Sequence, residues 1–293
     1  MTTVTFTTAI NPTTNAGFQT ACSELQSNLI TAGLILTTDT GQINVATVNS
    51  PSPNGAPAGY NIFKLPDSSL YIKLEYKLDG YNTMSFNIQV GEGSNGSGTL
   101  TGAISTSSGG GGNNYLGSTT TAYPTYICVT NGFFGLLYKV GSIIGGSTAG
   151  AFFAVSRTYN NTNTPSNLGY SVTVQPGQGS GMTKQFVRRA SPATTYTKIT
   201  ANAGGVYIVP GNVASSLDAL GNYQSYTQWM VIPEVIPDLN LVGYVVSDLP
   251  NLTTFTSSII GSYSHTYLTL GNNILGTAVN GGNTTYSTAM LWE

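Results

Sequence analysis

Apolar residues near the start of the chain recur with the period of a helix. They follow the i, i+3, i+4, i+7, i+11 spacing that places side chains on one helical face, and they are Phe18, Ala21, Cys22, Leu25 and Leu29. Thr14 or Asn15 can cap the start of this segment, and Gly33 can end it. The pattern predicts one N-terminal amphipathic helix.

The segment 71–79, YIKLEYKLD, alternates instead with the period of two that strands show. One face holds every second residue from Ile72 to Leu78, and the other face holds Lys73, Glu75, Lys77 and Asp79. Asp79-Gly80 then turns the chain toward Phe86, Ile88 and Val90, which alternate in the same way. We therefore predict a hairpin over 71–90, with its charged face in solvent as a ladder of ion pairs.

Further strand-like runs are separated by stretches rich in Pro, Gly and Asn. These runs are 125–130, 133–140, 151–158, 169–174, 205–209, 228–232, 241–246 and 265–270. Their spacing favours a mainly β fold, an antiparallel β-sandwich or barrel-like body with one N-terminal amphipathic helix, over βαβ units. We expect one β-rich domain over 1–293, with a subdomain boundary near 199–204 suggested by the distribution of charge.

Charged residues are scarce and unevenly placed in this chain of 293 residues. They make up 7% of the sequence, against about 25% in ordinary domains. All nine Lys and Arg fall between Lys64 and Lys198. Because phosphate binding needs clustered basic residues, we expect no nucleic-acid partner. Most of the surface is expected to be neutral and polar.

Membrane insertion and secretion are not predicted. No run approaches the roughly 18 apolar residues of a membrane span, and the opening MTTVTFTTAI lacks the basic and apolar regions of a secretory signal. Only Cys22 and Cys128 are present, so no disulfide framework is expected and a reducing cytoplasm suits their synthesis.

A glycine-rich segment, VGEGSNGSG at 90–98, matches the G-x-G-x-x-G spacing of a dinucleotide-binding turn through Gly91, Gly93 and Gly96. Such a site needs a helix directly after the glycines and an acidic residue about 20 positions later. Neither follows, because Thr99 and Leu100 begin a strand-like alternation and the next carboxylate after Glu92 is Asp218. We predict a wide turn or loop tip that holds no cofactor.

Catalytic chemistry is poorly supported by the remaining residues. His265 is the single histidine, and no G-x-S-x-G surrounds its neighbours Ser262 and Ser264. One His and two distant Cys do not make a zinc site. The carboxylates are interleaved with lysines or scattered, although two suffice for a glycan hydrolase, which stays an alternative. We predict no catalytic, cofactor-binding or metal-binding residues, and a protein that is not an enzyme.

Tyrosine is the abundant aromatic residue, with 18 copies. One region contains Tyr71, Tyr76, Tyr81, Tyr115, Tyr123 and Tyr126. Tyrosines suit a β-sheet core, a protein interface and stacking on sugars.

The carboxyl end of the sequence is apolar, whereas a free terminus is normally polar and frayed. Met290, Leu291 and Trp292 should be buried, as a closing strand or at an interface with a neighbouring subunit.

Several blocks of the sequence, in order from about residue 34 to 293, resemble structural proteins of tailed-bacteriophage virions. They are GYNIFKLPDSSLYIKLEYKLDG, VGEGSNGSGTLTG, FFGLLYKVG, AFFAVSRTYNNT, PEVIPDLNLVGYVVSDL, HTYLTLG and AMLWE. The resemblance implies a virion component assembled in the host cytoplasm, in the tail, baseplate, collar or capsid surface. Its expected partners are copies of itself and other virion proteins. The alternative is a module on the particle that binds a host-surface glycan.

Overall fold

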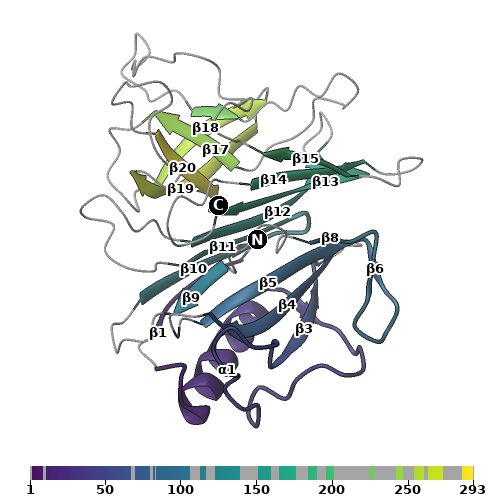
Figure 1. The fold of residues 1–293 in the computed structure, drawn as a ribbon. Helices are drawn as coiled ribbons and strands as arrows, with labels where there is room; N and C mark the ends of the chain where they lie inside the picture. Colours follow the sequence, from purple (N-terminus) through teal and green to yellow (C-terminus); the bar gives the residue numbers. More distant parts are fainter. Residues whose placement is uncertain are drawn as a thin grey trace. The chain divides into compact units, whose positions relative to one another are not determined.

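In its described part the chain folds mainly into antiparallel β-sheets with one helix near the start, as the computed structural model of the protein shows (Figure 1). Both features were predicted from the sequence and are confirmed. The structure describes residues 2–8, 11–66, 70–79, 82, 84–105, 113–116, 123–138, 151–159, 165–175, 184–189, 196–200, 225–227, 242–246, 254–260, 263–272 and 286–292.

Two compact units make up the structure, one formed by Met1–Phe153 with Pro176–Gly181 and the other by Ala154–Gln175 with Met182–Glu293. The elements of the first unit are β1 (Thr2–Thr8), α1 (Asn15–Thr31), β2 (Ile35–Leu36), β3 (Gly59–Lys64), β4 (Tyr71–Leu78), β5 (Met84–Gly91), β6 (Gly93–Ser94), β7 (Leu100–Thr101), β8 (Ile104–Ser105), β9 (Asn113–Leu116), β10 (Tyr123–Val129) and β11 (Phe133–Tyr138). β12 (Ala151–Tyr159) begins in the first unit and ends in the second.

Helix α1 begins and ends as the sequence predicts. The Thr14 hydroxyl accepts a hydrogen bond from the Gly17 N–H at 3.1 Å, which satisfies one of the unpaired donors of the first turn. At the other end Gly33 has a φ of +110°. Its N–H donates to the Ile30 carbonyl and that of Leu34 donates to the Leu29 carbonyl, which is the Schellman arrangement that glycine favours.

The apolar side of α1 packs against a sheet of order β2-β3-β4-β5-β8, to which β9 also pairs (Figure 1). All five residues of the predicted helical stripe are fully buried. Asn61, on β3, joins the two layers, because its Oδ1 accepts hydrogen bonds from Gln26 Nε2 of the helix at 3.2 Å and from the Tyr76 hydroxyl of β4 at 2.9 Å. Tyr76 in turn meets Phe86 of β5 edge to face. These contacts fix which face of the sheet is the core.

The outer edge of β3 is closed by the segment 37–43. β2 pairs with only the last two residues of β3. Beyond it, Thr37 N–H donates to the Ile62 carbonyl and Ile43 N–H donates to the Tyr60 carbonyl. The Ile62 N–H donates to Gln42 Oε1 at 2.7 Å, and Gln42 Nε2 donates to the Thr37 carbonyl at 2.8 Å. A loop and one side chain therefore satisfy backbone groups that an open edge strand would expose.

A second group of strands in the first unit has the order β1-β10-β11. The predicted strands at 125–130 and 133–140 correspond to β10 and β11, although residues 139–140 lie outside the described part. Strand β1 was not predicted, because its threonines hide the period of two. Ile127, Cys128, Phe133, Phe134 and Leu136 are buried in this group.

The second unit contains strands in two orders, β13-β14-β15 and β16-β17-β20-β19-β18. Their bounds are β13 (Pro165–Gln175), β14 (Lys184–Arg189), β15 (Tyr196–Thr200), β16 (Ser225–Thr227), β17 (Val242–Val246), β18 (Thr254–Ile260), β19 (Tyr263–Asn272) and β20 (Tyr286–Leu291). The strands predicted at 151–158, 169–174, 241–246 and 265–270 are confirmed as β12, β13, β17 and β19.

Two other predictions fall outside the described residues, namely the strands at 205–209 and 228–232. The subdomain boundary near 199–204 also falls largely there, so it stays a prediction, as does the single domain over 1–293. Each sheet of described strands ends in edge strands and none closes on itself. The sandwich or barrel-like arrangement is therefore not observed at this level of description.

Candidate functional site

The face of the β3–β4–β5 sheet opposite α1 carries polar side chains in register. Tyr60, Glu75 and Asn87 lie directly across from one another on the three strands, and Lys73 lies opposite Gln89. The apolar residues of β4 point the other way, so the predicted phase of this strand is confirmed.

The predicted solvent exposure of this face is wrong. The side chains of Lys73 and Glu75 are only 12% and 21% exposed. Tyr60 covers part of the face, because its ring lies 4.4 Å from Lys73 Nζ. The sequence pattern fixes which side of a strand is apolar, but it does not say whether another segment lies over the polar side.

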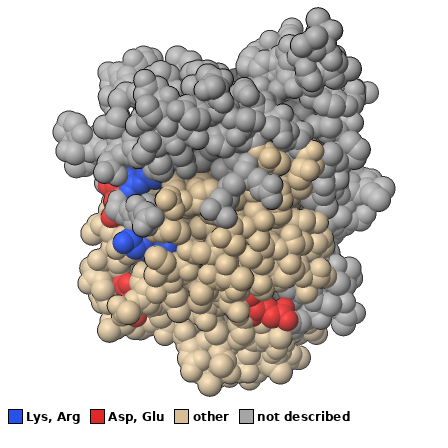
Figure 2. Space-filling view, turned by 180° about the vertical axis from the view of Figure 1, so that it is seen from behind, with Lys and Arg blue, Asp and Glu red and all other residues tan. Residues whose placement is uncertain are grey.

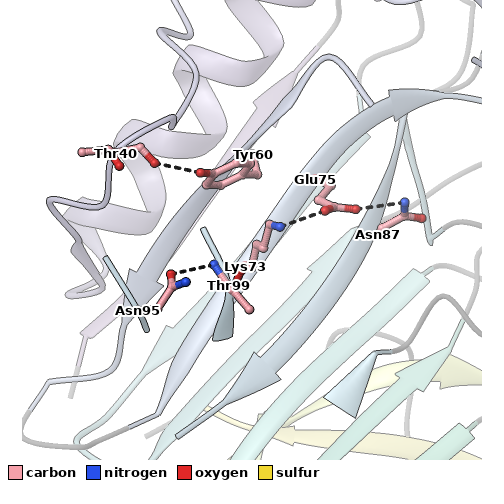
Figure 3. Close-up of polar contacts among 7 residues, drawn as sticks. All are labelled: Thr40, Tyr60, Lys73, Glu75, Asn87, Asn95 and Thr99. Carbon is pink, nitrogen blue, oxygen red and sulfur yellow. Dashed lines mark hydrogen bonds and ion pairs between the residues drawn. The ribbon is translucent and has the colours of Figure 1, made fainter. Parts of the chain in front are cut away.

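Three of these side chains form a continuous polar chain from β4 to β5 (Figure 3). Lys73 Nζ lies 3.0 Å from Glu75 Oε1. The second carboxylate oxygen of Glu75, Oε2, accepts a hydrogen bond from Asn87 Nδ2 at 3.2 Å. One carboxylate therefore holds an amine and a carboxamide at the same time. Such a carboxylate can orient both groups and can pass a proton between them.

Tyr60 is held by close backbone contacts at its hydroxyl end. Its hydroxyl donates to the Thr40 carbonyl at 2.8 Å (Figure 3). Gly98 lies against the same end of the ring, with a φ of +92°, and a Cβ added there would come within 2.5 Å of Tyr60 Cζ. Glycine is needed at this position for both reasons. The ring is thus fixed with the Lys73 ammonium on its face.

Asp39 links the 37–43 segment to the glycine-rich segment. Its carboxylate accepts hydrogen bonds from the hydroxyls of Ser94 and, at 2.6 Å, Thr37. Burial alone would raise the pKa of this carboxyl. The hydrogen bonds from Ser94, Thr37, the Gly98 backbone and its own backbone outweigh that effect and lower the pKa below its usual value. Asp39 therefore stays ionised and ties two loops together.

The glycine-rich segment is a small hairpin rather than a phosphate cradle. β6 and β7 pair through Gly93 with Thr101 and Ser94 with Leu100. Asn95 shapes the turn, because its Oδ1 accepts hydrogen bonds from the N–H of Ser97 and from the N–H of Thr99, the second of which Figure 3 shows. A strand follows the glycines, as predicted, so no helix dipole points toward the loop. The absence of a nucleotide stays a prediction.

The remaining sequence candidates are spread over the fold. His265 lies in β19 across from Ser257. Met290 and Leu291 lie in β20, which pairs with β17 on one side and β19 on the other. This position corresponds to the first of the two predicted alternatives, a closing strand. The backbone N–H of the half-buried Trp292 donates to the Thr266 carbonyl. An interface with a neighbouring subunit at these three residues stays a prediction. Asp218, Glu234, Asp238 and Asp248 lie outside the described residues.

The tyrosines of the cluster whose side chains the structure describes do not form one surface. Tyr76 is fully buried, and Tyr71 and Tyr126 are half-buried. Tyr81 lies outside the described residues. The sequence interpretation missed Tyr60, which lies outside the cluster, and it missed Asn87, whose only signal is its place among the alternating residues of β5.

Metal and membrane sites are also not found where the structure can be described. No group of three or more His, Cys, Asp or Glu that could hold a metal ion occurs among the described residues. No helix in that part of the chain is long and apolar enough to span a membrane. In the comparisons, no family model, curated protein or solved structure matches this chain. Its function has to be argued from its own residues.

Proposed function

We propose that this chain is a non-enzymatic structural protein of a tailed-bacteriophage virion and that it works as an oligomer. The observation that carries the proposal is how little charge the protein presents. Charged residues are 7% of the sequence, and tan dominates the described surface in Figure 2. Interface centres are depleted in charged residues, so such a surface suits a subunit packed among other subunits.

The internal pairing of the few charges supports the same proposal. Lys73 and Glu75 pair with each other, and the Asp39 carboxylate is held by hydrogen bonds from within the chain. These three charges are satisfied within the chain, and uncharged residues make up most of the described surface drawn in Figure 2. The covered edge of β3 supports it further, because a subunit kept at high concentration must avoid unintended edge-to-edge pairing.

The finer parts of the proposal follow the resemblance seen in the sequence. They are a sandwich or barrel-like body, a place in the tail, baseplate, collar or capsid surface, and partners that are copies of the chain and other virion proteins. The test is quantitative mass spectrometry of purified virions. We expect the same number of copies in every particle. This number should be a multiple of the rotational symmetry of the part of the virion that contains the chain. Absence from purified virions, with the chain present in the infected-cell lysate, would overturn the proposal.

The glycan-binding alternative stays a prediction. Tyr76 is buried, and the face of the Tyr60 ring near Lys73 is occupied, so neither offers an open ring face there for stacking on a sugar. A glycan array probed with the purified chain separates the two functions. Saturable binding to one class of glycan would favour the adhesion module.

A further inference from the structure

The polar chain Lys73–Glu75–Asn87 brings together a primary amine, a carboxylate and a carboxamide. These are the groups needed to form an amide bond between two side chains. Glu75 lies between the other two, with Oε1 at 3.0 Å from Lys73 Nζ and Oε2 at 3.2 Å from Asn87 Nδ2 (Figure 3). We propose that this site forms an intramolecular isopeptide bond between Lys73 Nζ and Asn87 Cγ, promoted by Glu75.

The strand register places the two reacting residues within reach. Glu75 is directly opposite Asn87, and Lys73 is directly opposite Gln89. Lys73 and Asn87 are therefore diagonal neighbours on the same face of an antiparallel pair. Their Cα atoms are expected to be about 7–8 Å apart, which long side chains can bridge. No backbone rearrangement is needed, because the lysine side chain only has to swing from the carboxylate toward the adjacent amide.

The chemistry balances without any added reagent. Lys73 Nζ, after giving one proton to Glu75, attacks Asn87 Cγ as a nucleophile, and a bond forms between them. The Cγ–Nδ2 bond then breaks as Glu75 gives its proton to the departing nitrogen, and the second proton lost by Nζ passes through the Glu75 carboxylate to the released ammonia. The products are a secondary amide, one ammonium ion and a Glu75 carboxylate in its starting state. No atom changes its oxidation state.

The surroundings favour this reaction in two ways. The Lys73 and Glu75 side chains are mostly shielded from water, at 12% and 21% exposed, so the carboxylate acts where solvent competes less for its hydrogen bonds. The fixed Tyr60 ring, 4.4 Å from Nζ, restricts where the amine can move. Because the amine is held near the amide, the two groups react within one molecule, which is faster than a reaction between freely diffusing groups.

Intact-mass spectrometry of the denatured full-length chain tests the proposal. We expect the parent protein to be lighter than its sequence mass by one ammonia. Lys73→Arg and Glu75→Gln should each have the full sequence mass. Lys77→Arg is the matched control, because Lys77 lies on the same face of the same strand, and this variant should lose ammonia as the parent does.

Peptide mapping distinguishes the cross-link from a succinimide, which also releases ammonia at Asn-Gly sequences. Trypsin should leave residue 73 uncut and yield the peptide 65–77 joined to the peptide 78–139. The linked protein should also melt about 5–10 °C higher than Lys73→Arg, because the bond closes a loop in the unfolded chain. A parent protein at its full mass after prolonged incubation, with residues 73 and 87 in separate peptides, would overturn the proposal. Undiminished linkage in Glu75→Gln would overturn the role of Glu75.

Discussion

Replacing Gln42 with alanine should open the edge of β3. In the folded protein the Gln42 side chain takes the place of a neighbouring strand, since it accepts from the Ile62 N–H and donates to the Thr37 carbonyl. The substitution removes both bonds at once while leaving the backbone of the sheet unchanged. No core side chain is shortened.

The expected loss of stability follows from the burial of Ile62, which is 0% exposed. Its N–H would lose a 2.7 Å bond and stay buried without an acceptor, which costs about 1–3 kcal/mol. The Thr37 carbonyl would lose a 2.8 Å bond, worth about 0.5–1.5 kcal/mol. Together these give a decrease of about 1.5–4.5 kcal/mol in the free energy of unfolding, a large share of the stability of a typical domain.

Urea titration of the full chain measures this decrease, and hydrogen exchange at the Ile62 amide locates it. Gln19→Ala is a matched control, because Gln19 Nε2 also donates to a loop carbonyl, that of Val48 at 2.9 Å, but accepts no hydrogen bond from a buried N–H in the described contacts. Its cost should stay near 1 kcal/mol. If both variants lose the same stability and the Ile62 amide exchanges as slowly as in the parent, the edge does not depend on Gln42.

Four further outcomes are expected. Ile72→Asp should lower the free energy of unfolding by at least about 4 kcal/mol in a urea titration, because it places an unpaired carboxylate in a fully buried position; an unchanged midpoint would contradict the strand phase. Gly98→Ala should lower the melting temperature by several degrees, because its Cβ would crowd the Tyr60 ring at a positive φ, and a Tyr60→Leu background should recover part of the loss. The pKa of Asp39 is lowered in the folded protein, so its ionised carboxylate stabilises the fold fully above about pH 4, and this stabilisation is lost as the pH falls through the folded-state pKa. Asp39→Asn should therefore make the free energy of unfolding depend less on pH in the acid range. Deleting 290–293 removes part of the central strand β20 and should prevent folding of the second unit or entry into particles, as checked by circular dichroism and virion incorporation; a truncated chain that folds and enters particles normally would show that this end is dispensable.

Local patterns in the sequence were sufficient to predict α1 and the phase of β4. The stripe from Phe18 to Leu29 has one period and clear caps, so no distant contact is needed to identify the helix. The strict alternation from Ile72 to Leu78 likewise specifies its own buried face. Both elements carry their signal within a short window.

The candidate site could not be predicted in the same way, because it depends on register. A two-residue turn at Asp79-Gly80 would place Glu75 opposite Met84, whereas the observed pairing of Leu78 with Met84 places it opposite Asn87. The connection between these strands is longer than a two-residue turn, and Asn82 within it has a φ of +58°. Loop length, rather than strand composition, decides which side chains meet.

Contacts between distant segments explain the other parts of the fold that the sequence did not predict. Asp39 and Ser94 are held together although they lie far apart in the chain, and no local pattern joins them. The threonine-rich β1 and the two-residue strands β2, β6, β7 and β8 carry too few apolar residues to show a period. Such elements form because a neighbour supplies the pairing that their own composition does not specify.

The position of β20 sets the order in which the second unit can be completed during synthesis. It follows all the other described strands in the chain, yet it pairs with β17 on one side and with β19 on the other. The hairpin of β18 and β19 and the pair of β16 and β17 can form while the chain is still growing. They can join into one sheet only after residues 286–291 have left the ribosome, so until then the nascent chain carries two half-sheets with unpaired edges that require the same strand.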